Sequence, residues 1–100
     1  MEFFQPYMER ITDLCRQHQV ASLYAFGSSV KGGLSAESDV DLLFELKSVD
    51  PHEFADNFWA LEEKFEALFG RHVDLISRRA MKNKYLIAQV ESEKVKLYEA

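Results

Sequence analysis

The sequence predicts a single α/β (α+β) domain over residues 1–100, with one small β-sheet of about four strands flanked by helices. Two observations support this fold class. At 100 residues, the chain is long enough for one hydrophobic core and too short for two domains. Along it, segments with apolar residues at helical steps alternate with segments in which apolar and polar residues alternate, as in strands. Strands that alternate with helices typically form a sheet covered by those helices.

The first half of the chain predicts a helix, a strand, a sharp turn and a second strand. Residues 3–19 carry apolar side chains at three- and four-residue steps, as an amphipathic helix does. Residues 22–26 alternate and are rich in strand formers, and Gly27 with Ser28 ends that strand. After a short helical turn, we expect a polar loop over 34–38 and a strand over 39–46.

The second half is built around one long helix. Apolar residues form a stripe along residues 52–69, and Gly70 follows as a helix stop. Trp59 and Phe69 lie off that stripe, which leaves open a broad core face or a second face for a partner. The remaining expected elements are a strand over 72–76, a helix over roughly 78–92 capped by Ser77, and a strand over 95–98.

Composition excludes several classes of protein. With 12 Lys+Arg against 17 Asp+Glu, the formal charge is −5, whereas a dedicated nucleic-acid binder is usually basic. The single cysteine, Cys15, cannot form an intramolecular disulfide and falls on the apolar side of the first helix. No apolar run approaches the ~20 residues of a membrane span. We therefore expect a soluble, cytoplasmic protein.

The segment that follows the first strand has the composition of an anion-binding turn. A strand runs into Gly27 and Ser28, and a short helix begins there, so several backbone N–H groups face one point. Ser28 adds a hydroxyl donor and Lys31 adds a positive charge. The segment is not a Walker A loop, because Gly33 follows Gly32 where a lysine would be needed. A plain tight turn after a strand remains the alternative.

Asp39 and Asp41 form a pair of carboxylates on the second strand. Residues two apart on a strand point to the same face, while Val40 and Leu42 point the other way, into the core. Two such carboxylates repel each other, and a divalent cation removes that conflict. Mg²⁺ prefers oxygen ligands and completes its shell with water and substrate phosphate. The alternative is that Asp39 caps the loop and Asp41 lies on a solvated edge.

Asp74 is a third carboxylate in a similar apolar strand. If this strand lies beside the second one, Asp74 joins Asp39 and Asp41. Three carboxylates beside a phosphate-binding turn suggest two-metal phosphoryl-type transfer. A surface aspartate at a strand end is the alternative reading of Asp74.

Two further groups of polar residues carry a weaker signal. The three histidines, His18, His52 and His72, show no ligand spacing and are expected to be structural or surface residues. Five basic residues lie close to the third strand in sequence, which favours a solvated helix start or, alternatively, contact with a triphosphate or an acidic partner. They are Arg71, Arg78, Arg79, Lys82 and Lys84.

Taken together, these motifs resemble the signature of the minimal nucleotidyltransferases of the polymerase-β-like superfamily. That signature has Gly-Ser, three variable residues, a Gly, and then Ser-Asp-x-Asp-Leu. This chain has Gly27-Ser28, Gly32 and Ser38-Asp39-Val40-Asp41-Leu42 in matching register. The later VDLI resembles the strand that carries the family's third acid, and NKYLIAQVESEKVKLYEA resembles the family's closing helix and strand.

The resemblance implies a fold and a role for each matched residue. It implies a mixed sheet, a Gly27-Ser28 turn that holds nucleotide phosphates, and Mg²⁺ bound by Asp39 and Asp41. It implies that Asp74 helps activate the incoming hydroxyl. Lys31 stands where many relatives have arginine, so any phosphate contact here lacks the two-pronged guanidinium.

The resemblance also implies a partner. The family's minimal members pair with helical HEPN proteins, often RNase toxins, and in studied types transfer AMP from ATP to a toxin tyrosine. The enzyme hypothesis is therefore an antitoxin that is an Mg²⁺-dependent adenylyltransferase. The alternative is a non-catalytic antitoxin that blocks its partner by occlusion. An antibiotic-modifying enzyme is disfavoured because the chain has no room for a substrate domain. Association into a homo-oligomer is compatible with either hypothesis.

Overall fold

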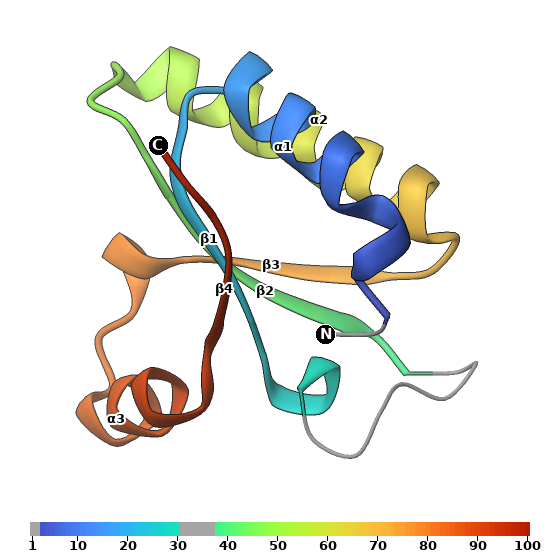
Figure 1. Ribbon diagram of the computed structural model, residues 1–100. Helices are drawn as coiled ribbons and strands as arrows, with labels where there is room; N and C mark the ends of the chain where they lie inside the picture. The colour runs from blue at the N-terminus through green and yellow to red at the C-terminus, as the bar shows by residue number, and fades with distance from the viewer. Residues whose placement is uncertain (1–2, 31–37) are drawn as a thin grey trace.

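The fold is a four-stranded mixed sheet with three helices, seen here in a computed structural model that describes residues 3–30 and 38–100 (Figure 1). The strand order is β3-β2-β1-β4, with β1 antiparallel to both β2 and β4, and β2 parallel to β3. This confirms the expected fold class. The helices and strands are α1 (Met8–Gln17), β1 (Val20–Phe26), β2 (Val40–Leu46), α2 (Pro51–Phe69), β3 (Val73–Ser77), α3 (Lys84–Glu93) and β4 (Val95–Glu99).

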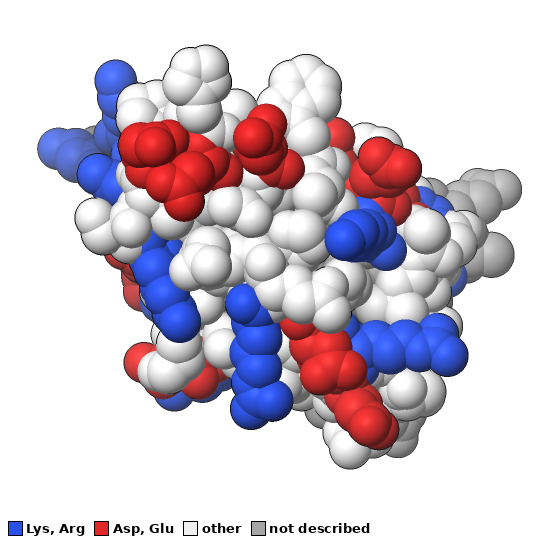
Figure 2. Space-filling model, turned by 90° about the horizontal axis from the view of Figure 1, so that it is seen from above, with Lys and Arg blue, Asp and Glu red and all other residues white. Residues whose placement is uncertain are grey.

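Two layers of helices cover the sheet unequally. Helices α1 and α2 lie together on one face, and α3 lies on the other (Figure 1). Acidic and basic side chains are interspersed over the α1–α2 face, without a large field of one sign (Figure 2). The chemistry described below lies on the face that carries α3.

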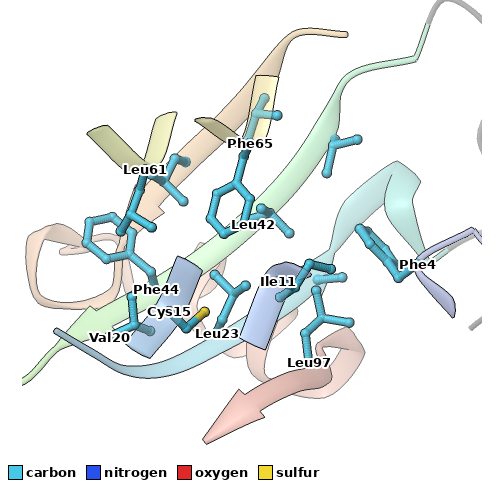
Figure 3. Close-up of a cluster of buried hydrophobic side chains, with 14 of the residues drawn as sticks. Phe4, Ile11, Cys15, Val20, Leu23, Leu42, Phe44, Leu61, Phe65 and Leu97 are labelled. Carbon is cyan, nitrogen blue, oxygen red and sulfur yellow. The ribbon is translucent and has the colours of Figure 1, made fainter. Parts of the chain in front are cut away.

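The main core lies between the sheet and the α1–α2 layer. Side chains from both helices meet the apolar side chains of β1 and β2 there (Figure 3). Cys15 is fully buried in this cluster, and burial raises the pKa of its thiol to about 12. The thiol is therefore neutral packing, as expected. The labelled members are Phe4, Ile11, Cys15, Val20, Leu23, Leu42, Phe44, Leu61, Phe65 and Leu97.

Alternation along β2 separates core from site. Val40 and Leu42 are buried in the main core. Asp41 and Leu43 point to the other face, where Leu43 packs with Phe26 and Val90 in a second, smaller cluster. The predicted opposite orientation of the aspartates and the core residues is therefore confirmed for Asp41.

Helix α2 begins and ends at the residues that the sequence favours. The Asp50 carboxylate accepts a hydrogen bond from Glu53 N–H at 2.8 Å, and Pro51 opens the helix. Gly70 ends it in a left-handed conformation with φ of 67°. Phe69 is buried, so the core face is broad there, whereas Trp59 is 68% exposed.

The third helix begins later than the sequence suggested. A helix from residue 78 with Ser77 as its cap was expected, but Ser77 extends β3 by pairing with Phe44. A short 3-10 turn, η3 (Arg78–Ala80), follows, and α3 begins only at Lys84. Its cap is Asn83, whose side chain accepts hydrogen bonds from Tyr85 and Leu86 N–H. Ser77 pairs as a strand residue instead of capping a helix because this pairing extends the parallel hydrogen bonding between β2 and β3.

The start of the chain differs in a similar way. The expected helix over 3–19 is a 3-10 turn, η1 (Gln5–Tyr7), followed by α1. Pro6 lies inside that first turn, where its lack of an N–H is tolerated. Among the described residues, no helix is both long and apolar enough to cross a membrane.

Candidate active site

The site begins at the turn that follows β1, η2 (Gly27–Ser29). Gly27 has φ of 60°, which residues with a side chain rarely adopt. A Cβ atom there would lie 2.6 Å from Oδ2 of Asp41, so the position also has no space for a side chain. Ser28 donates to the same oxygen twice, from its N–H at 3.3 Å and from its hydroxyl at 3.2 Å. The turn and the Asp41 carboxylate are therefore in direct contact.

Ser29 fixes the backbone of the second strand against this turn. Its side chain is buried, and its Oγ accepts a hydrogen bond from Asp41 N–H at 2.7 Å. Sequence analysis did not single out Ser29. No local pattern marked it, because its partner Asp41 lies twelve residues later in the chain. Its effect is to hold the start of β2 where the turn donors can reach Asp41.

Strand register brings Asp41 and Asp74 side by side. In the parallel pairing of β2 with β3, Asp41 stands opposite Asp74. Burial raises the pKa of the Asp41 carboxyl, the hydrogen bonds from Ser28 lower it, and the negative charges of Asp74 and Asp39 raise it further. The net pKa is raised. Asp41 is thus a half-buried carboxylate that is repelled by the negative charges of Asp74 and Asp39.

Asp39 lies just before β2 and contacts His72. Its Oδ2 is 3.3 Å from His72 Nδ1, and both side chains are more than half exposed. Glu66 on α2 lies 3.9 Å from the other ring nitrogen. The sequence reading placed His72 among structural or surface residues and missed this contact. The signal was the shared spacing: if Asp41 faces Asp74, the residues two positions earlier, Asp39 and His72, also face each other.

The five basic residues near the third strand do not form one group. Arg71 lies at the site end, where its Nη1 donates to the Ser38 carbonyl at 3.2 Å and its guanidinium lies 5.0 Å from the Phe3 ring centre. Arg78 lies at the other end of β3 and pairs with Glu91 at 3.1 Å. Proximity in sequence to Asp74 therefore did not predict proximity in space. Lys31 and Gly32, expected at the phosphates, lie outside the described residues.

Comparison with known proteins shows the family to which this chain belongs. Residues 8–97 match the nucleotidyltransferase domain family, and the match covers nearly the whole chain, including both strands that carry the motifs. The chain belongs to the nucleotidyltransferase domain family.

Individual nucleotidyltransferases resemble this one in sequence and in fold. The protein adenylyltransferase MntA of Thermococcus cleftensis is 34% identical over 71 residues, which cover 71% of this chain and 69% of the relative. A solved structure assigned as a minimal nucleotidyltransferase is 28% identical, covers 94% of this chain and 92% of its own, and superposes with a TM-score of 0.78. A crystal structure of a toxin–antitoxin pair, MntA–HpeT, contains a chain that is 25% identical with a TM-score of 0.68, covering 92% of this chain and 72% of that one.

The carboxylates of this nucleotidyltransferase suit a divalent cation as part of a larger ligand shell. Within residues 3–30 and 38–100, no three His, Cys, Asp or Glu side chains are arranged to hold a metal ion by themselves. Mg²⁺ needs only one or two protein carboxylates when substrate phosphates and water complete its shell. The raised pKa of Asp41 fits this, since its charge is disfavoured by burial and by Asp74 and Asp39 until a cation lies nearby.

Proposed function

We propose that this nucleotidyltransferase transfers AMP from ATP to a protein hydroxyl in the presence of Mg²⁺. The proposed acceptor is a tyrosine of a helical HEPN toxin, which would make the chain an antitoxin of the cytoplasm. The observation that carries the proposal is the contact between the Gly27–Ser28 turn and Asp41, with Asp74 in register beside it. The assignment of a relative as a protein adenylyltransferase and the fold of a toxin–antitoxin chain support the acceptor class.

The turn supplies the phosphate contacts in this proposal. Ser28 N–H and O–H both donate to a carboxylate oxygen now, and a phosphate oxygen is an equivalent acceptor. Gly27 lets the phosphates approach the backbone because nothing projects from its Cα. Gly32 and the Lys31 charge are proposed to assist from the next segment. Asp39 and Asp41, with Asp74, would hold Mg²⁺, which neutralises charge on the triphosphate when bound.

Asp74 is the general base in this proposal. Its side chain is exposed, so an acceptor hydroxyl from another protein can reach it. The acceptor proton passes to the Asp74 carboxylate while the acceptor oxygen forms a bond to the α-phosphorus. The bond from that phosphorus to its bridging oxygen breaks, and pyrophosphate leaves. The products are an AMP-modified hydroxyl and pyrophosphate, so atoms and charge balance.

The test is AMP transfer to the protein encoded by the adjacent gene. We would incubate both proteins with α-labelled ATP and Mg²⁺ and measure intact masses. We expect one or more AMP additions on the partner, and a loss of transfer of at least about 100-fold in Asp41→Asn, in line with the removal of a positioned catalytic group. Asp56→Asn, an exposed change on α2, is the matched control and should transfer normally.

Two results would contradict the proposal. Wild-type turnover in Asp39→Asn/Asp41→Asn would remove the paired carboxylates from the mechanism. A stable complex with no adduct on either protein would favour the other reading, an antitoxin that acts by occlusion. Neutralisation of a co-expressed partner by Asp39→Asn would support that second reading, since occlusion needs no transfer.

A further inference from the structure

The segment before β2 and the segment before β3 meet at one edge of the sheet. In the parallel pairing, Val40 stands opposite Val73, so the residues that lead into the two strands lie side by side (Figure 1). Val40 N–H donates a hydrogen bond to the His72 carbonyl at 3.0 Å. Arg71 Nη1 donates to the Ser38 carbonyl at 3.2 Å. These contacts fix the backbone of the segment that leads into the candidate active site.

The same edge of the sheet brings a histidine ring to the Asp39 carboxylate. His72 Nδ1 lies 3.3 Å from Oδ2 of Asp39. On the other side of the ring, His72 Nε2 lies 3.9 Å from Oε2 of Glu66 on α2. That Glu66 oxygen also accepts a hydrogen bond from Val73 N–H at 3.0 Å. The imidazole therefore stands between two carboxylates, one of which is bonded to the backbone of β3.

The two carboxylates of the Asp-x-Asp pair differ in what orients them. Asp41 accepts two hydrogen bonds from Ser28, at 3.3 Å and 3.2 Å. Asp39 lies just before β2, and its side chain is 55% exposed. Backbone contacts place Asp39 but do not fix the direction of its carboxylate, because an exposed side chain can change rotamer. The contact with His72 supplies that direction.

Stability of the fold is a weak explanation for this contact. Both side chains are more than half exposed, and exposed ion pairs contribute about 0–1 kcal/mol. By contrast, a group that holds a metal-ligating carboxylate typically changes metal affinity or activity by about 10–100-fold. An effect of the His72 ring is therefore expected at the site and not in the free energy of unfolding.

We propose that His72 is a positioning residue for the transfer reaction. Its Nδ1 holds Oδ2 of Asp39 and leaves the other oxygen of that carboxylate for Mg²⁺. Glu66 keeps the imidazole in place from α2. The inference rests on the proposed function, because it assumes that Asp39 ligates a cation when the nucleotide binds.

Three substitutions of His72 separate its Nδ1 from the rest of the ring. His72→Asn carries a side-chain nitrogen as many bonds from Cα as Nδ1, and His72→Gln carries one as many bonds away as Nε2. His72→Ala removes both. The matched control is His52→Ala, an exposed histidine in the first turn of α2.

Three measurements would be made on each variant. Electron paramagnetic resonance would give the affinity for Mn²⁺ in the presence of saturating AMP-PNP. Transfer of labelled AMP would give kcat and the KM for the partner protein. Circular dichroism melts would verify that each variant folds.

We expect a loss at the metal that depends on the position of the nitrogen. His72→Ala and His72→Gln should lose about tenfold in Mn²⁺ affinity and in kcat, with an unchanged KM for the partner. His72→Asn should recover most of both quantities, because its amide can donate to the same Asp39 oxygen. All three variants should melt close to wild type, and His52→Ala should match wild type throughout.

Other outcomes would overturn the inference. Wild-type Mn²⁺ affinity and kcat in His72→Ala would show that the contact has no role at the site. A loss in His72→Asn as large as in His72→Ala would reject Nδ1 as the orienting group. A raised KM with unchanged Mn²⁺ affinity would assign His72 to contact with the partner. Wild type with neither Mn²⁺ binding nor AMP transfer would overturn the proposed function as well, whereas the preceding outcomes leave it standing.

Discussion

At the scale of single residues, contacts with Asp41 define the site. Ser28 donates two hydrogen bonds to its carboxylate, and Ser29 accepts a hydrogen bond from its backbone N–H. Gly27 leaves room for the carboxylate because it has no side chain. The negative charge of Asp74 raises the pKa of this carboxyl. The position of one carboxylate thus depends on a turn that is more than ten residues earlier in the chain.

Gly27→Ala tests that dependence. The added Cβ meets Asp41 Oδ2 at 2.6 Å, and the left-handed backbone costs about 1–2 kcal/mol for a residue with a side chain. We expect a displaced carboxylate and at least about a tenfold loss of AMP transfer, in addition to reduced stability. Labelled-ATP transfer and urea unfolding would be measured together.

Gly70→Ala is the matched control for that change. Gly70 also has a left-handed backbone, with φ of 67°, but a Cβ atom added there would have nothing within 4 Å. It should lose a similar amount of stability and keep its transfer rate. Equal transfer rates in Gly27→Ala and Gly70→Ala would show that the close approach to Asp41 has no catalytic meaning.

At the scale of elements, the helices differ in how well local sequence predicts their ends. Helix α2 ends at Gly70 as expected, and its start is capped by Asp50, which sequence analysis did not single out. Helix α3 has two competing caps, Ser77 and Asn83, and only the second is used. The choice was made by the pairing of Ser77 with Phe44, a contact between two strands that are far apart in the sequence.

Asn83→Ala should therefore weaken α3, and Ser77→Ala should not. Asn83 satisfies two N–H groups at the start of the helix, and loss of such a cap costs about 1 kcal/mol. Urea unfolding of the two variants would measure the difference. Equal loss of stability in both variants would contradict a capping contribution specific to Asn83.

At the scale of the whole molecule, one main core joins α1 and α2 to the sheet. Phe65 from α2 is fully buried in it, and its ring stacks on Phe69 at 5.9 Å between centres. Phe69 in turn meets Phe3, Phe4 and Tyr7 from the start of the chain. The main core therefore links segments from both halves of the described chain.

Phe65→Ala should destabilise the whole fold. Truncation of a buried phenylalanine costs about 3–5 kcal/mol, and the exposed Trp59→Ala should stay within about 0.5 kcal/mol of wild type. Chemical unfolding followed by far-UV circular dichroism would compare the two variants. In wild type and in Phe65→Ala, the fluorescence of Trp59 gives a second probe. Separate transitions for the two probes would contradict a single shared core.

Local patterns in the sequence were enough to predict the kind of fold and much of the chemistry. Periodicity predicted helices and strands, and the alternation along residues 39–42 predicted that Asp41 faces away from the core. The Gly-Ser and Asp-x-Asp spacings indicated the nucleotidyltransferase family. These signals are local, so they can be read without knowing which segments meet. The roles of Lys31 and Gly32 stay predictions.

Which residues meet at the site was settled by tertiary contacts alone. The parallel register of β2 and β3 placed Asp74 beside Asp41 and brought His72 to Asp39. The packing of α3 on the sheet, through Val90 against Phe26 and Leu43, placed Glu91 beside Arg78 at the far end of β3. Strand register and helix packing come from contacts between distant segments, and a local pattern carries no information on them.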